Sequence, residues 1–313
     1  MDKMFLKCRE LLLGNTKSKL SDEAIDLLSI SILALYLNDG EIILERMPEI
    51  IKNLDIIKVD YKTVFEMIRE INRNAVYDEY KDTAGANVTL FNNNGIIETL
   101  IISLSQRNSK LEIIDTMVHE LTHLLRKGEI LGGDGCLSFY EGISVRHRDM
   151  LYNNVIRVHV GLEDAIVEHH AKETITTLVE FLKGEKEDSI CKSLLDGEQL
   201  EYSDVEPCAY NFFNRTLDIL CEDDIFKEEL EKTFRTPDHL GKGMMRRFNA
   251  VLGSDDAFAD YSCLFDQMIE ALINHDNRRS DVLCGIIAEM TKSFFFESGA
   301  NEKRGIKRPL EKA

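Results

Sequence analysis

The 313-residue sequence has no tryptophan, only four prolines and no two cysteines in a C-x-x-C arrangement. Its seven cysteines are odd in number and widely spread, which argues against a disulfide framework or a cysteine zinc site and favours a reducing compartment. The longest apolar run, 27–37, contains two serines and is much shorter than the roughly 20 residues that a membrane helix needs. We therefore expect a cytoplasmic protein that does not insert into a membrane. Export by a route that needs no cleavable signal is left open.

Basic residues are outnumbered by acidic ones. The chain has 38 lysines and arginines against 56 acidic residues, a formal net charge of −18. Nucleic acids and anionic membranes both require a positive field, so we expect no nucleic-acid partner. Neither a dinucleotide-binding or phosphate-binding glycine loop nor a G-x-S-x-G nucleophile elbow is present. An apolar fraction of 44% nevertheless indicates a folded protein.

Hydrophobic periodicity indicates a mainly helical chain with a short β segment. Helical patterns cover 22–37, 41–54 and 61–77, and they return from about residue 110 onward. Between them, the apolar runs 86–91 and 96–104 flank an Asn-Gly turn, a pattern typical of a β-hairpin. The sequence therefore predicts a predominantly helical α+β fold, with a small hairpin-containing sheet.

A charged break at 183–189 marks the predicted domain boundary. We expect a catalytic region over 1–183 and a helical C-terminal lobe over 184–297. The basic residues 298–313 have low apolar content and are predicted to form a flexible tail.

One motif carries chemistry. Residues His119, Glu120 and His123 form H-E-x-x-H, which chance would produce in roughly 2% of chains of this composition. Positions i and i+4 share one helix face, so both imidazoles can reach a single metal ion. Glu120 then lies beside a metal-bound water and can accept its proton.

The pattern around the motif supports a functional role for the two histidines. An apolar stripe runs along the helix at Ile113, Ile114, Met117, Val118, Leu121, Leu124 and Leu125. On a helical wheel His119 and His123 project from the opposite side, together with Arg126. The two histidines are therefore predicted to lie outside the hydrophobic core.

A later helical segment, 161–182, offers a third metal ligand. Asp164 and Glu168 fall on a face that is otherwise apolar, where a carboxylate is costly unless a cation or donor meets it. Glu163, His169 and His170 project outside that face, so the adjacent histidines are predicted to be polar-surface residues. Asp164 and Glu168 are the favoured candidates.

With these motifs, the chain resembles the zincin metallopeptidases, specifically the gluzincin group. The resemblance covers roughly 85–180, and H-E-x-x-H is its specific match. It implies a zincin-like core in which the sheet lies beside the active helix, and one Zn²⁺ held by His119, His123 and Asp164. Glu168 would support a ligand histidine or replace Asp164 as ligand. The family pattern has Glu where this chain has Asp164, and Asn where it has Glu163.

The activity implied is hydrolysis of a peptide or protein substrate by zinc-activated water, with Glu120 as general base. The alternative is a catalytically inactive, zincin-like helical protein that binds or regulates a partner. A di-iron bundle would need a second Glu-x-x-His, and His123 alone among the eight histidines has Glu three residues before it. The residue that stabilises the oxyanion is left open among Tyr140, His147, Arg148, Tyr152, His159 and Tyr210.

Overall fold

A computed structural model describes residues 2–16, 20–52, 54–59, 85–92, 95–103, 109–126, 131–133, 136–149, 154–186, 189–195, 208–235 and 241–300. For most strand residues it describes the backbone alone. The predicted helix over 61–77 and the tail residues 301–313 lie outside this part of the chain.

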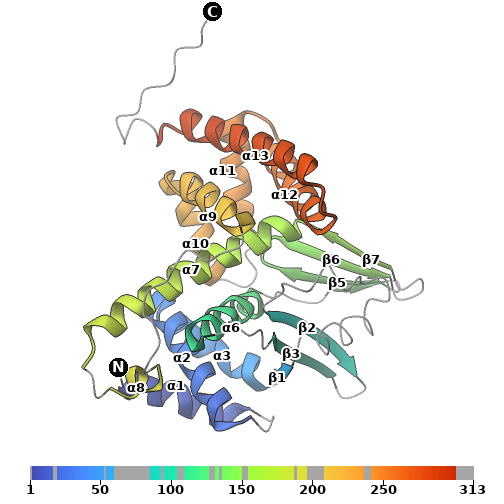
Figure 1. Cartoon of the computed structure of the whole chain (residues 1–313). Helices are drawn as coiled ribbons and strands as arrows, with labels where there is room; N and C mark the ends of the chain where they lie inside the picture. Colours follow the sequence, from blue (N-terminus) through green and yellow to red (C-terminus); the bar gives the residue numbers. More distant parts are fainter. Residues whose placement is uncertain are drawn as a thin grey trace, which may run out of the picture. The chain divides into compact units, whose positions relative to one another are not determined.

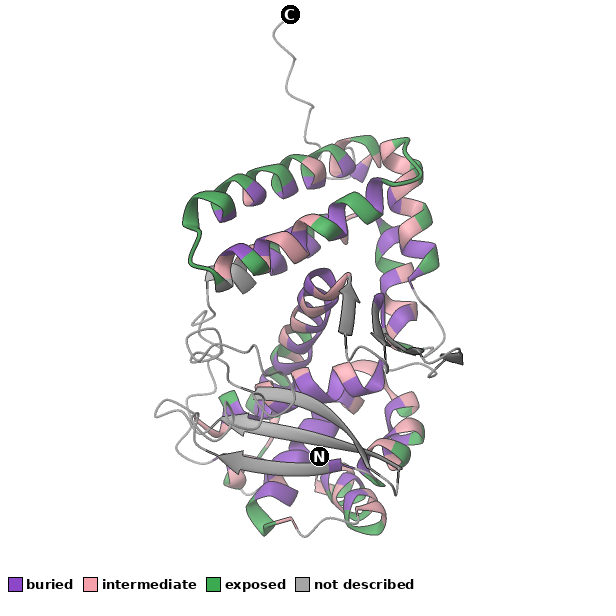
Figure 2. Ribbon diagram, turned by 90° about the vertical axis from the view of Figure 1, so that its right-hand side faces the viewer, coloured by how far each residue is buried: buried purple, intermediate pink, exposed green. Residues whose placement is uncertain are grey.

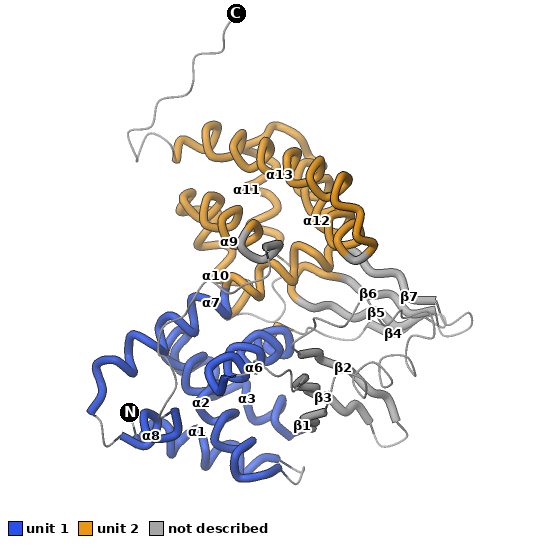
Figure 3. The backbone as a smooth tube through the Cα atoms, in the orientation of Figure 1, with its two compact units in different colours: residues 1–125, 170–203 blue, residues 126–169, 204–313 orange. Residues whose placement is uncertain are grey.

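The chain divides into two compact units, coloured separately in Figure 3. Unit 1 consists of Met1–Leu125 and His170–Ser203, and unit 2 of Arg126–His169 and Asp204–Ala313. Each unit is thus built from two separate stretches of sequence. One division falls inside helix α7 (Val160–Gly184), whereas the sequence places the domain boundary after residue 183.

Helices dominate unit 1. They are α1 (Asp2–Asn15), α2 (Asp22–Asp39), α3 (Glu41–Lys52), α6 (Lys110–Leu125), the second part of α7, and α8 (Ile190–Leu194), as labelled in Figure 1. Helix α2 begins where the sequence predicts, because the Ser21 hydroxyl accepts a hydrogen bond from the Ala24 N–H, and it ends at Gly40 with φ 81°.

The core of unit 1 surrounds helix α2, which is apolar on nearly all sides. Eleven of its residues are buried, including Ser29 and Ser31, whose hydroxyls donate to backbone carbonyls one turn earlier. Apolar residues of α1, α3, α6, α7 and α8 complete this core. A helix buried on all sides is stable only when other elements cover each of its faces.

Unit 2 has a second helical core, rich in aromatic side chains. Its C-terminal helices are α9 (Cys208–Leu220), α10 (Asp224–Arg235), α11 (Lys242–Leu252), α12 (Ala257–Ile273) and α13 (Asn277–Glu297). The ring of Phe248 stacks on Phe294, with ring centroids 5.1 Å apart, and also contacts Tyr261. Figure 2 shows the resulting amphipathic pattern, with buried and exposed residues on opposite sides of the same helices. None of the described helices combines the length and apolar character needed to cross a membrane.

Two groups of strands are described by their backbones. In unit 1 the order is β1-β3-β2, with β1 (Leu54–Val59) parallel to β3 (Gly95–Ser103) and β2 (Gly85–Asn92) antiparallel to it. In unit 2 the order is β4-β5-β6-β7, all antiparallel. Their bounds are Leu131–Gly133, Cys136–Glu141, Ser144–Asp149 and Asn154–Val158.

The prediction of a zincin-like α+β core, with one small hairpin sheet beside the H-E-x-x-H helix, is wrong. The chain is mainly helical where side chains are described, and among those side chains helices supply nearly all of the core cluster that includes α6. Leu54, at the start of β1, is the one strand residue in this described core. The physical reason is that α2, which is apolar on nearly all sides, packs against α6 and supplies much of the apolar cover that the sequence assigned to a sheet.

Candidate metal centre

Helix α6 carries the H-E-x-x-H motif on a rigid, well-packed element. The seven residues of its predicted apolar stripe are all buried, so that prediction is confirmed. The helix begins with a reciprocal cap, in which the Ser109 hydroxyl accepts from the Glu112 N–H and the Glu112 carboxylate accepts from the Ser109 N–H. Burial of the stripe fixes which way the opposite face of the helix points.

His119 and His123 lie one turn apart on that opposite face and are both partly buried. Their Nε2 atoms are 3.1 Å apart, with ring centroids separated by 4.8 Å. Two Zn–N bonds of about 2.0–2.1 Å at a tetrahedral angle place the nitrogens about 3.3 Å apart. The observed separation therefore suits two ligands of one metal ion, and it also suits a hydrogen bond between neutral rings.

Glu120 occupies the position between these histidines and is only 7% exposed. A carboxylate next to a metal-binding histidine can act as a general base toward a water molecule. The sequence order of the motif thus places a buried carboxylate next to a histidine that can bind metal.

Helix α7 carries the two carboxylates predicted as further ligands. Asp164 and Glu168 are partly buried and one turn apart, and the apolar residues predicted to share their face are all buried. His119, His123 and Asp164 form a group of side chains that could hold a metal ion. Two nitrogens and one carboxylate oxygen are a donor set that zinc accepts, so these residues fit the ion.

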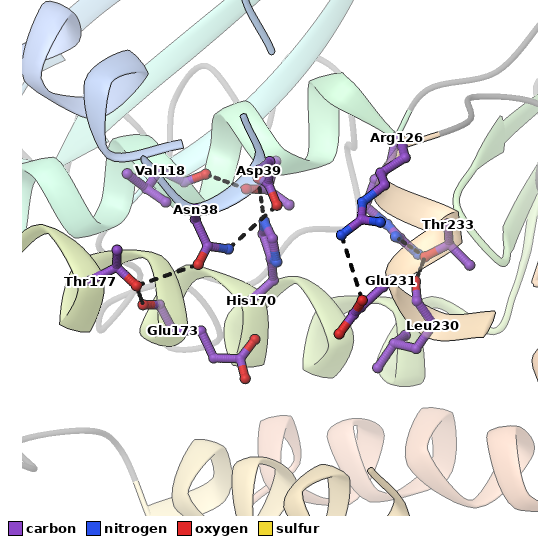
Figure 4. Close-up of polar contacts among 12 residues, drawn as sticks. Asn38, Asp39, Val118, Arg126, His170, Glu173, Thr177, Leu230, Glu231 and Thr233 are labelled. Carbon is purple, nitrogen blue, oxygen red and sulfur yellow. Dashed lines mark hydrogen bonds and ion pairs between the residues drawn. The ribbon is translucent and has the colours of Figure 1, made fainter. Parts of the chain in front are cut away.

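His169 and His170 do not lie on a polar surface, and this prediction is wrong. They are 7% and 5% exposed, and each faces a carboxylate on another helix. The His169 Nε2 is 3.0 Å from an Asp218 oxygen, and the His170 Nε2 is 3.0 Å from an Asp39 oxygen. Figure 4 shows the contact between His170 and Asp39. Each ring therefore has a carboxylate partner at its Nε2 atom.

Sequence reasoning also missed a buried ion pair between Arg126 and Glu163. The Nε and Nη2 groups of Arg126 donate to the two carboxylate oxygens of Glu163, the second at 2.9 Å. The Nη1 group donates to the Thr233 hydroxyl, as drawn in Figure 4. Helical periodicity assigned both charged residues to polar positions, and no local signal identifies each as the partner of the other.

The start of α7 is anchored by Asp266 of α12. Its two carboxylate oxygens accept from the backbone N–H groups of His159, at 3.0 Å, and Gly161, at 2.6 Å. His159 has φ 62°, and its Nδ1 is buried with no hydrogen-bond partner among the described residues. Burial lowers the pKa of His159, and the negative charge of Asp266 partly opposes that shift.

Of the open candidates for oxyanion stabilisation, His159 alone has a described side chain. The side chains of the remaining five lie outside the described residues: Tyr140, His147, Arg148, Tyr152 and Tyr210. No protein-family model matches the chain, and neither a curated protein nor a solved structure matches it.

Proposed function

We propose that the protein is a zinc-dependent metallopeptidase. The observation that carries this proposal is the pair of Nε2 atoms 3.1 Å apart on the H-E-x-x-H helix. The carboxylate of Asp164 completes a group that could hold a metal ion, which supports that residue as the third ligand. The zincin resemblance, which rests on the same motif, suggests the peptide bond as the substrate. The seven widely spread cysteines, which suggest no disulfide framework, support a cytoplasmic location.

The residues of this chain divide the chemistry between them. His119, His123 and Asp164 would hold one zinc ion, which supplies a polarised water with a pKa of about 7 and a Lewis acid for the carbonyl. Glu120 would act as the general base, taking up a proton at its carboxylate and passing it to the leaving amine. Glu168 orients a ligand histidine or serves as a reserve ligand.

Replacement of Glu120 tests its role as general base. Glu120→Gln keeps the shape of the side chain but removes its basicity, so we expect cleavage to fall by about 10²–10⁴-fold while bound zinc is retained. Incubation with a peptide library, followed by mass spectrometry of the new termini, measures the loss. Glu112→Gln is the matched control, because it lies on the same helix and its amide can preserve the exposed cap.

Metal analysis of the same proteins tests the ligand assignment. His119→Ala should lose zinc, and Asp164→Ala should lose it while Glu168→Ala retains it. Full zinc retention in Asp164→Ala would transfer the third-ligand role to Glu168. The peptidase proposal is abandoned if the wild type holds no stoichiometric zinc or if Glu120→Gln cleaves as fast as wild type. Zinc without any cleavage would favour the inactive binding protein.

A further inference from the structure

The buried ion pair of Arg126 and Glu163 lies next in sequence to the proposed metal ligands. Arg126 comes three residues after His123, directly beyond the end of α6. Glu163 immediately precedes Asp164 in the first turn of α7. Their side chains are 0% and 2% exposed. One interaction therefore fixes the chain just after a histidine ligand and just before the carboxylate ligand.

The pair is held from several directions at once. Besides its two bonds to Glu163, Arg126 donates to Thr233, and its guanidinium carbon lies 4.3 Å from the centre of the Phe234 ring. The Glu163 carboxylate also accepts from the backbone N–H of Ile143 at 2.9 Å. A bidentate guanidinium–carboxylate pair with these additional contacts has one well-defined geometry.

Stability is a weak explanation for such a pair. Removing two charges from water costs so much that apolar residues of the same volume often give an equally stable or more stable protein. A buried pair does hold the two chain segments that carry it in one relative position. A metal centre requires this, because its ligands must be placed within a few tenths of an ångström.

We infer that Arg126 and Glu163 are positioning residues for the proposed zinc centre. Their ion pair sets the orientation of the start of α7, and hence the direction in which Asp164 presents its carboxylate. This inference rests on the proposed function. Groups that orient metal ligands without touching the ion alter metal affinity by about 10–100-fold when they are replaced.

The test is a measurement of zinc affinity on the full chain, by competition with a chromophoric chelator. Glu163→Gln preserves the size of the side chain but removes its charge and one acceptor. We expect it to bind zinc about 10–100-fold more weakly than wild type. The Co²⁺-loaded protein should show an altered visible spectrum, because its absorption depends on ligand geometry.

Asp223→Asn is the matched control. Asp223 has a buried carboxylate that pairs with the partly exposed Arg247 of the same unit and also accepts a hydrogen bond from the Phe226 N–H. This variant should lose stability while its zinc affinity and cobalt spectrum stay unchanged. It therefore separates an effect on the metal centre from a general loss of stability.

Thr233→Val keeps the test decisive if Glu163→Gln does not fold. It removes one hydrogen bond from Arg126 and leaves the ion pair, so we expect zinc affinity to fall about two- to fivefold. Wild-type affinity and cobalt spectra in both folded variants would overturn the positioning role alone. Absence of zinc binding by the wild type would overturn the proposed function together with it, and this is detected before any variant is compared.

Discussion

At the scale of single residues, the molecule buries charged and titratable side chains that the sequence pattern places on polar surfaces. Arg126, Glu163, His169 and His170 are all at most 7% exposed. Each faces an opposite or complementary group, because a buried charge without a partner is strongly destabilising.

His159 is expected to make the stability of the folded protein depend on pH. Its pKa is lowered by burial, so the unfolded chain binds a proton more readily than the folded protein does. Above the unfolded pKa of about 6.5, His159 is neutral in both states and does not reduce the free energy of unfolding. As the pH drops below that value, the unfolded chain binds the proton preferentially and the free energy of unfolding falls. Asn tolerates the positive φ of this position, so His159→Asn should fold and reduce this loss.

Denaturant unfolding at pH 7, 6 and 5 measures the effect. The free energy of unfolding should fall less between pH 7 and pH 5 in His159→Asn than in wild type, by at most about 1.4 kcal/mol per pH unit. His275→Asn is the control, since His275 also has positive φ but is exposed. Identical pH slopes in wild type and His159→Asn would contradict the prediction.

The H-E-x-x-H residues could be predicted from sequence because they are neighbours on one helix, where spacing determines direction. The partners of the buried charges could not. Asp39 lies 131 residues from His170 in sequence, and Thr233 lies 107 residues from Arg126. No period along the chain connects such residues, since only the packing of helices brings them together.

At the scale of elements, helix α7 has two very different ends. Its N-terminal end packs closely, since a Cβ atom on Gly161 would lie 2.8 Å from the backbone carbon of Phe265. Its last residue, Gly184, is exposed and has no atom within 4 Å of that position. Replacing each of these two glycines by alanine should therefore change the stability of the protein in opposite directions.

Gly161→Ala is predicted to destabilise the protein by about 1–3 kcal/mol, because the added methyl group overpacks against backbone. Gly184→Ala is predicted to stabilise it by about 0.5–1 kcal/mol, since alanine loses less backbone entropy in a helix. Urea unfolding of the two variants and wild type measures both changes. A neutral or stabilising Gly161→Ala would show that α12 and α7 can separate without cost.

Helices could be predicted from the sequence where capping residues mark their ends or an apolar period marks their buried face. Ser21 and Gly40 delimit α2, and the apolar period of α6 identifies its buried face. The packing partner of α6 was not predictable, because an apolar stripe fits a sheet and a helix equally well. The resemblance to zincins favoured a sheet, whereas the described side chains packed around α6 come mainly from helices, α2 among them.

At the scale of the whole molecule, a metal ion that binds the folded state alone should stabilise it. Free zinc at 100 times its dissociation constant contributes about 2.7 kcal/mol. For a chain of this size we expect the midpoint of thermal unfolding to rise by about 5 °C. Calorimetry with zinc and with a chelator measures the shift, and His119→Ala is the control that should show none.

An equal rise in wild type and His119→Ala would assign the stabilisation to zinc bound elsewhere. No rise in wild type would contradict a folded-state zinc site. If the two units unfold in separate transitions, the transition that shifts identifies the unit that zinc stabilises.

Patterns in the amino-acid sequence were sufficient to predict the predominance of helix, the limits of α2, the buried face of α6 and the identity of the two candidate histidine ligands. These properties follow from spacing and capping within short segments, where backbone geometry alone relates one residue to the next. The tertiary structure decided that helices pack against α6, that His169 and His170 are buried beside carboxylates, and that Arg126 pairs with Glu163. Those outcomes depend on which surfaces meet, and residues far apart in the chain meet only when the whole fold forms.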